Sequence, residues 1–169
     1  MRNRCALAML GLLWIGGAAR AEWQYTHWGM TAEQIVEASG GMARAIHGDE
    51  QKQKSNELHF TTLALAPYSV GNFTFEVSFR AKAGGSVLNE VSLELREAGH
   101  YQALWDALEE KYGKGEVLPG EDLMGIATRK SIQWKTKTDI VRLLRDDYHA
   151  PMDPRVELKY QQRPSSEGL

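Results

Sequence analysis

The segment Phe73-Thr-Phe-Glu-Val-Ser-Phe-Arg80 decides the fold class. Three phenylalanines and a valine alternate with polar residues, and a period of two residues is that of a β-strand with one buried face. Residues 81–85, AKAGG, supply a turn, and Val91-Ser-Leu-Glu-Leu-Arg96 alternates in the same way. The pattern predicts an antiparallel hairpin with one face in water.

Two helices are expected, one on each side of this hairpin in the chain. Thr31 and Gln34 have the spacing of a capping box, which predicts a short helix over 32–39. Apolar residues at 101, 104, 105, 108 and 112 form one helical stripe, and Gly113 ends it. Further strands are predicted over 58–66, 131–137, 140–145 and 155–161, with Pro67 ending the first. Polar or glycine-rich loops are expected over 48–57 and 113–127.

The order helix, strands, helix, strands predicts an α+β domain, in which two helices pack on one face of an antiparallel sheet. We expect residues 22–162 to form this single domain and residues 163–169 to be a disordered tail.

The first 21 residues have the pattern of a secretion signal. Arg2 and Arg4 precede an apolar run over 6–17, and Ala19-Arg20-Ala21 supplies the small residues of a cleavage site. The run is too short to cross a bilayer, which needs about 20 residues. We therefore expect cleavage after Ala21, a periplasmic or secreted location, and no stable membrane insertion afterwards. An uncleaved N-terminal anchor is the other interpretation.

Charge and cysteine usage exclude several classes of function. The chain has 20 Lys and Arg against 22 Asp and Glu, and removal of residues 1–21 leaves 17 against 22. An acidic domain of this kind is not expected to bind nucleic acid. Cys5 is the only cysteine, so the mature chain would hold no disulfide and no thiolate site.

No motif for catalysis or for a cofactor emerges. The five histidines show no metal-ligand spacing, no nucleophile elbow is present, and the adjacent acids at 109–110, 121–122 and 146–147 are typical of solvated surface. We expect no catalytic residue, no metal and no cofactor.

One charge asymmetry suggests a contact surface. Residues 128–163 hold nine Lys and Arg against five acids. We take Arg142, Arg145, Lys135 and Lys137, together with Trp28, as candidate contacts, and such a basic face could meet an acidic protein partner or anionic envelope polymers and lipids. The alternative is that the basic residues keep strand edges soluble and that Trp28 covers the sheet.

The chain also resembles a group of small exported bacterial proteins of unknown function. The resemblance rests on motifs that occur in order over residues 23–161. They are Trp28-Gly-Met-Thr31, Ala66-Pro-Tyr68, Gly71-x-Phe73-x-Phe75-x-Val77-x-Phe79, Leu108-x-x-Lys111-Tyr112-Gly113, a strand tryptophan and Leu158-x-Tyr160. More distantly, the chain is similar to the small outer-membrane-assembly lipoproteins and to the β-lactamase-inhibitor-protein fold. The resemblance implies a periplasmic α+β domain and assigns no functional residue. Proteins of this group often have cysteines near the second helix and in the late strands. This chain has none there, and Tyr101 stands at the start of the second helix.

Three hypotheses of function follow. The first is a non-enzymatic domain that binds an envelope protein. The second is an inhibitor or immunity protein against a secreted enzyme, which needs a protruding loop, and residues 113–127 are the candidate. The third is a small periplasmic hydrolase, which needs a deep pocket lined by a histidine or a carboxylate.

Overall fold

The structure is a computed structural model that describes residues 23–149 and 151–163. The expected signal peptide and residues 164–169 of the expected tail lie outside this range. Arg163, the first residue of that tail, is attached to the domain, because its backbone N–H donates a hydrogen bond to the Thr138 carbonyl at 2.7 Å.

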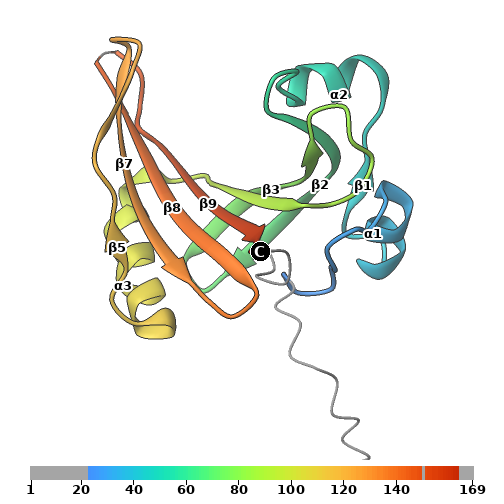
Figure 1. The fold of residues 1–169 in the computed structure, drawn as a ribbon, viewed down its shortest axis with the longest axis horizontal. Helices are drawn as coiled ribbons and strands as arrows, with labels where there is room; N and C mark the ends of the chain where they lie inside the picture. Colours follow the sequence, from blue (N-terminus) through green and yellow to red (C-terminus); the bar gives the residue numbers. More distant parts are fainter. Residues whose placement is uncertain (1–22, 150, 164–169) are drawn as a thin grey trace, which may run out of the picture.

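A single antiparallel sheet dominates the fold (Figure 1). The described residues form nine strands in the order β1-β2-β3-β4-β9-β8-β7-β5, with β6 also paired to β7. Their bounds are β1 (Arg44–Ala45), β2 (Phe60–Val70), β3 (Phe73–Lys82), β4 (Glu90–Leu95), β5 (Glu116–Val117), β6 (Glu121–Leu123), β7 (Ala127–Lys135), β8 (Asp139–Tyr148) and β9 (Arg155–Gln162). The antiparallel sheet and the α+β class are confirmed, with more strand than expected.

The predicted hairpin lies at the centre of this sheet. β3 pairs with β4 in a register that places Phe75 opposite Leu95 and Phe79 opposite Val91. The other edge of β4 pairs with β9, where Leu93 lies opposite Leu158. This pairing joins the strands that precede the long helix to those that follow it.

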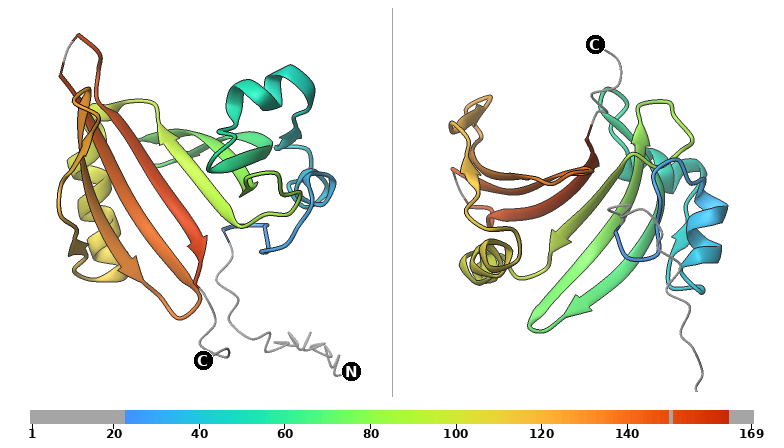
Figure 2. Two further views of the ribbon diagram at one scale, coloured as in Figure 1. Left: turned by 45° about the horizontal axis from the view of Figure 1, so that its top comes forward. Right: turned by 60° about the horizontal axis from the view of Figure 1, so that its bottom comes forward.

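Both predicted helices are present. α1 (Ala32–Ala38) begins with the expected capping box of Thr31 and Gln34. α3 (Tyr101–Tyr112) follows a short 3-10 helix, η1 (Ala98–His100), and ends at Gly113, whose φ of 80° favours glycine. Buried residues of both helices belong to one cluster with the apolar face of the sheet. α3 lies beside the β7–β9 half, and α1 lies near the opposite end of the sheet (Figure 2).

Residues 48–57 do not form the expected loop, because a third helix, α2 (Gly48–Lys54), occupies most of this segment. It buries no residue, so apolar periodicity could not reveal it. Acids in its first turn and lysines in its last complement the helix dipole. The Gln51 side chain donates to the Thr62 carbonyl at 2.9 Å, and the Thr62 hydroxyl donates to the Lys54 carbonyl. α2 therefore forms through contacts with β2.

Two other expectations were wrong. Pro67 does not end its strand, because β2 continues to Val70. β1 pairs with β2 at Ala64 and Leu65, so among the described residues Pro67 lies where β2 is an edge strand and no second neighbour needs an N–H. Residues 113–127 are not simply a loop either, since β5 and β6 both pair with β7.

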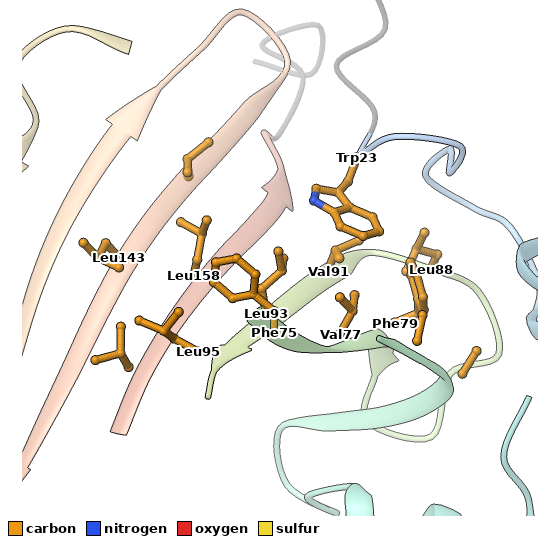
Figure 3. Packing of buried hydrophobic residues seen from close by; sticks show 14 of the residues in the cluster. Trp23, Phe75, Val77, Phe79, Leu88, Val91, Leu93, Leu95, Leu143 and Leu158 are labelled. Carbon is orange, nitrogen blue, oxygen red and sulfur yellow. The ribbon is translucent and has the colours of Figure 1, made fainter. Parts of the chain in front are cut away.

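The apolar core gathers on one face of the curved sheet. Phe75, Leu93 and Leu158 come from three adjacent strands and lie together, and Trp23 reaches toward them from the N-terminal segment (Figure 3). Trp134 is buried, whereas Trp105 is only partly buried against the cluster.

Candidate functional site

A cleft of about 780 Å³ opens between α3 and the N-terminal segment. Its floor is the apolar face of β3, β4, β8 and β9. One wall is the helix face that carries Leu104, Ala107 and Leu108, and the opposite wall carries Trp23 and Trp28. Pockets for small ligands usually have about 300–1,000 Å³ and mostly apolar linings. The cleft therefore has the size and character of a ligand site.

The wall opposite α3 is aromatic. Trp23 packs edge-on against Tyr68, with ring centres 5.3 Å apart, and Tyr68 stacks on Phe75 at 6.1 Å. Phe73 extends this surface toward the β2–β3 turn and contacts the His100 ring at 6.2 Å. Because His100 directly precedes α3, this contact places the β2–β3 turn at the N-terminal end of the helix.

Backbone hydrogen bonds hold the N-terminal wall over the sheet. The Gly29 N–H donates to the Leu88 carbonyl, and the Leu88 N–H donates to the Met30 carbonyl, both at 2.8 Å. The Trp28 indole N–H donates to Asp139 Oδ1 at 3.0 Å. Trp28 thus connects this wall to the start of β8.

The polar groups of the cleft lie at its other end, where α3 stops. The Trp134 indole N–H donates to the Gly113 carbonyl at 2.8 Å, which ties the end of α3 to β7 just before the β7–β8 turn. Residues 136–139 of that turn and residues 111–112 of the helix line the cleft. The cleft therefore has an apolar end near Phe73 and a polar end beside the turn.

Tyr160 supplies a neutral hydroxyl at the polar end. Burial raises the pKa of Tyr160 far above its ordinary value, and the adjacent Tyr112, which shares a hydrogen bond with it, raises the pKa further. The Asp139 carboxylate is also buried there, and it accepts hydrogen bonds from the Trp28 indole and from the Thr138 hydroxyl.

Two ammonium groups complete the polar end. Lys111 and Lys137 both line the cleft and are exposed. Lys111 Nζ lies 4.9 Å from the centre of the Tyr112 ring. Within residues 23–149 and 151–163, neither lysine forms an ion pair, whereas Lys52, Lys54, Lys130, Lys135 and Lys159 each have an acidic partner.

Of the five residues predicted as partner contacts, the structure brings two to this cleft, Trp28 and Lys137. Lys135 instead pairs with Glu116 at 3.2 Å. Arg142 donates to the Gln133 side chain, whereas the Arg145 guanidinium lies 5.2 Å from the Tyr101 ring of α3. Since side chains alternate along a strand, Arg142 and Arg145 lie on opposite faces of β8 and form no common surface.

The basic late strands are largely neutralised by acids. Arg129 holds Asp146 with two hydrogen bonds of 2.7 and 2.8 Å, and Arg155 pairs with Glu94. Deeper in the sheet, Arg80 contacts both Glu90 and Glu157. The charge asymmetry along the chain is thus balanced across neighbouring strands.

Glu157 is the centre of this buried ion-pair network. Burial raises its pKa, but Lys159, Arg80 and Arg155, together with a hydrogen bond from the Ser92 hydroxyl, outweigh burial and lower the pKa to about 2. The Arg80 guanidinium also lies over the Phe60 ring, 4.0 Å from its centre. These groups stabilise the sheet, and they do not line the cleft.

A second surface feature is an exposed apolar tip made by Met124, Ile126 and Met152. Met124 is 92% exposed and has a φ of 53°, which is rare outside glycine. The loops that follow β6 and β8 lie side by side at the far end of β7–β9 (Figures 1 and 2). A hydrogen bond connects the two loops, in which the His149 N–H donates to the Ile126 carbonyl at 3.1 Å.

Metal-ligating and acid–base groups are few among the described residues that could form a catalytic site. They include no group of three His, Cys, Asp or Glu placed to hold a metal ion. In the same part of the chain, the cleft is lined by no histidine, and its one carboxylate, Asp139, is engaged as described.

Sequence patterns missed the cleft because each of its residues has a simpler local role. Tyr112 ends an apolar helical stripe, Tyr160 continues an alternating strand, and Lys111 is one polar residue on a helix. The repeated aromatic residues at 23, 28, 68 and 73 were a signal, but only the tertiary structure places them around one space.

Comparison with known proteins adds no assignment. No protein-family model, curated protein or solved structure matches the chain. The resemblance to small exported proteins therefore stays a prediction. Among the described helices, none is long and apolar enough to span a membrane.

Proposed function

We propose that this chain is an exported, non-enzymatic binding domain and that the cleft is its ligand site. The observation that supports this most directly is the cleft itself, which is partly enclosed and lined mainly by apolar and aromatic side chains. Some of the lining residues, such as Phe75 and Leu158, already belong to the buried core, whereas Trp28, Tyr68 and Phe73 keep part of their surface in water. Covering exposed apolar surface is worth about 25 cal/mol per Å². A ligand that covers this surface gains this free energy.

Binding rather than catalysis is favoured by the state of the polar groups. A general acid or base must be free to reach its substrate. Asp139 accepts two hydrogen bonds from neighbouring side chains. Tyr160 is held in its neutral form by burial and by Tyr112. These groups are suited to orienting a ligand.

Export is part of the proposal and rests on the sequence of residues 1–21. Arg2 and Arg4, the apolar run and Ala19-Arg20-Ala21 support it. Mass spectrometry of the envelope fraction should find a chain that begins at Glu22. A chain intact from Met1 in the cytosol would refute this part.

The cleft is tested with a neutral fluorescent probe, N-phenyl-1-naphthylamine, whose emission rises in apolar surroundings. The protein is purified as the cell delivers it, and the probe is titrated in. Ala107→Trp places a large side chain on the exposed helix face that lines the cleft, so we expect at least a tenfold weaker affinity for the probe.

Ala103→Trp is the matched control. Ala103 is also an exposed alanine of α3, but it does not line the cleft. It should leave the affinity unchanged. Equal affinity in both variants, or no probe binding to the wild type, would contradict the cleft as a binding site.

A protein partner, either an envelope protein or a secreted enzyme that the chain inhibits, is a second proposal, supported by the apolar tip. Exposed apolar groups on a protruding loop are typical of protein contacts. Deleting residues 113–127 would remove β5 and β6 from the sheet, so a photo-crosslinking residue in place of Met124 is a sharper test. The control is the same residue in place of Met42, which is 60% exposed. A specific adduct at 124 alone supports this proposal, and identical patterns refute it.

A further inference from the structure

We propose that the ligand of the cleft is a long-chain carboxylate, with its hydrocarbon chain along the aromatic wall and its carboxylate between Lys111 and Lys137. This inference rests on the proposed binding function and names the chemical class of the ligand.

The first step is the division of the cleft into two chemically different ends. Phe73 lies at the N-terminal end of α3, whereas Lys111 lies in its last turn. The helix rises about 10 Å between Leu104 and Lys111, and the side chains of Leu104, Ala107 and Leu108 line the cleft between them. A ligand that follows the helix therefore passes from an apolar environment to a polar one.

The second step is the charge of the polar end. Lys111 and Lys137 contribute two positive charges, and neither has an acidic partner among the described residues. Asp139 contributes one negative charge and is held by Trp28 and Thr138. The described residues that line this end therefore have a net charge of +1, which a single carboxylate complements. Arg163, whose guanidinium donates to the Thr136 carbonyl at 3.0 Å, lies beside the same turn but is not among the residues that line the cleft.

The third step is hydrogen bonding. An ammonium group and a carboxylate form charge-assisted hydrogen bonds, which are stronger than neutral ones. Tyr160 and Tyr112 place hydroxyl groups at the same end. An alcohol of the same chain length gains the apolar contacts without this ionic contribution.

The test compares laurate with 1-dodecanol as competitors of the neutral probe in the purified protein. We expect laurate to displace the probe at a concentration about tenfold lower than dodecanol, since one charge-assisted contact is worth about one decade of affinity. The double variant Lys111→Met and Lys137→Met should lose this preference and keep its affinity for dodecanol and for the probe.

The control removes the same charge elsewhere. Lys82 and Lys114 are also exposed, form no ion pair in the described part of the chain, and do not line the cleft. Lys82→Met with Lys114→Met should leave the laurate preference intact.

The outcomes separate the two proposals. If the probe binds but laurate shows no preference over dodecanol, or if the cleft variant keeps the preference, the ligand class is wrong and the cleft remains a binding site. A preference for dodecyl phosphate over laurate also overturns it. If the probe does not bind the wild type, the proposed function itself fails.

Discussion

The ionised carboxylate of Glu157 should carry a measurable share of the stability of the fold. Its side chain is 7% exposed and contacts Arg80 at 2.9 Å and Lys159 at 3.5 Å. Its pKa is about 2 in the folded protein, against an ordinary value of 4.5. Since one pKa unit corresponds to about 1.36 kcal/mol, the ionised form contributes about 3 kcal/mol to the free energy of unfolding.

The sign of the pH dependence follows from the lowered pKa. The unfolded chain takes up a proton at Glu157 near pH 4.5, whereas the folded protein resists it until about pH 2. The contribution is therefore complete above about pH 5.5. It is lost progressively as the pH falls toward about 2.

Urea unfolding of the wild type and of Glu157→Gln from pH 7 to pH 2.5 measures this contribution. At pH 7 the variant should be less stable by about 3 kcal/mol, because the buried Arg80 guanidinium loses one of its two carboxylate partners and keeps only Glu90. The difference between the two proteins should shrink by most of this amount as the pH falls. Glu116→Gln is the control, because Glu116 is an exposed acid whose pKa is also lowered.

A constant stability difference across this pH range would refute the reasoning, since it would mean that the cost of the substitution is steric rather than electrostatic. Equal pH dependence in Glu157→Gln and Glu116→Gln relative to the wild type would refute it as well.

Two further predictions concern the effect of single substitutions on stability. Gly115→Ala should lower the free energy of unfolding by about 1–3 kcal/mol, because a Cβ there would lie 2.4 Å from Ile132 Cγ2. Gly120→Ala is the control and should change stability much less, since a Cβ at residue 120 would lie no closer than 3.8 Å to its nearest neighbour. Equal urea midpoints for the two variants would contradict this prediction. Thr31→Ala removes the N-cap of α1 and should cost about 1 kcal/mol, whereas Thr31→Ser should restore most of it; a fully stable alanine variant would show that the capping box contributes nothing.

Local pattern was a good guide to several elements of the fold. The alternation over 73–80 and 91–96 predicted β3 and β4 with their buried faces, and the stripe from Tyr101 to Tyr112 predicted α3 within its observed bounds. These succeeded because the apolar residues of each segment share one face, so that its period is visible in its residues. The expected water-facing side of the hairpin was wrong in part, because Arg80 and Ser92 on that side are buried around Glu157. α2 was missed because it buries none of its residues.

The sequence did not reveal the cleft as a site. Trp28 and Lys137, which were named as candidate contacts, line the cleft, whereas Arg142 and Arg145 lie on opposite faces of β8 because they are an odd number of residues apart on one strand. A contact role for any of these residues stays a prediction. Some of the acids that pair with the late strands come from other segments, such as Glu94 and Glu116, and charge counts along the chain cannot show such pairs.

The order of residues alone thus determines which segments have an apolar face, that α1 and α3 are helices with caps at Thr31 and Gly113, and that an antiparallel sheet is the outcome. The tertiary structure alone decides that β4 pairs with β9, that β2 runs past Pro67, and that α3 and the N-terminal segment leave a cleft between them. The physical reason is that periodicity is a property of neighbouring residues. A cleft is a property of surfaces that meet only when residues such as Trp28 and Asp139, 111 positions apart, come into contact.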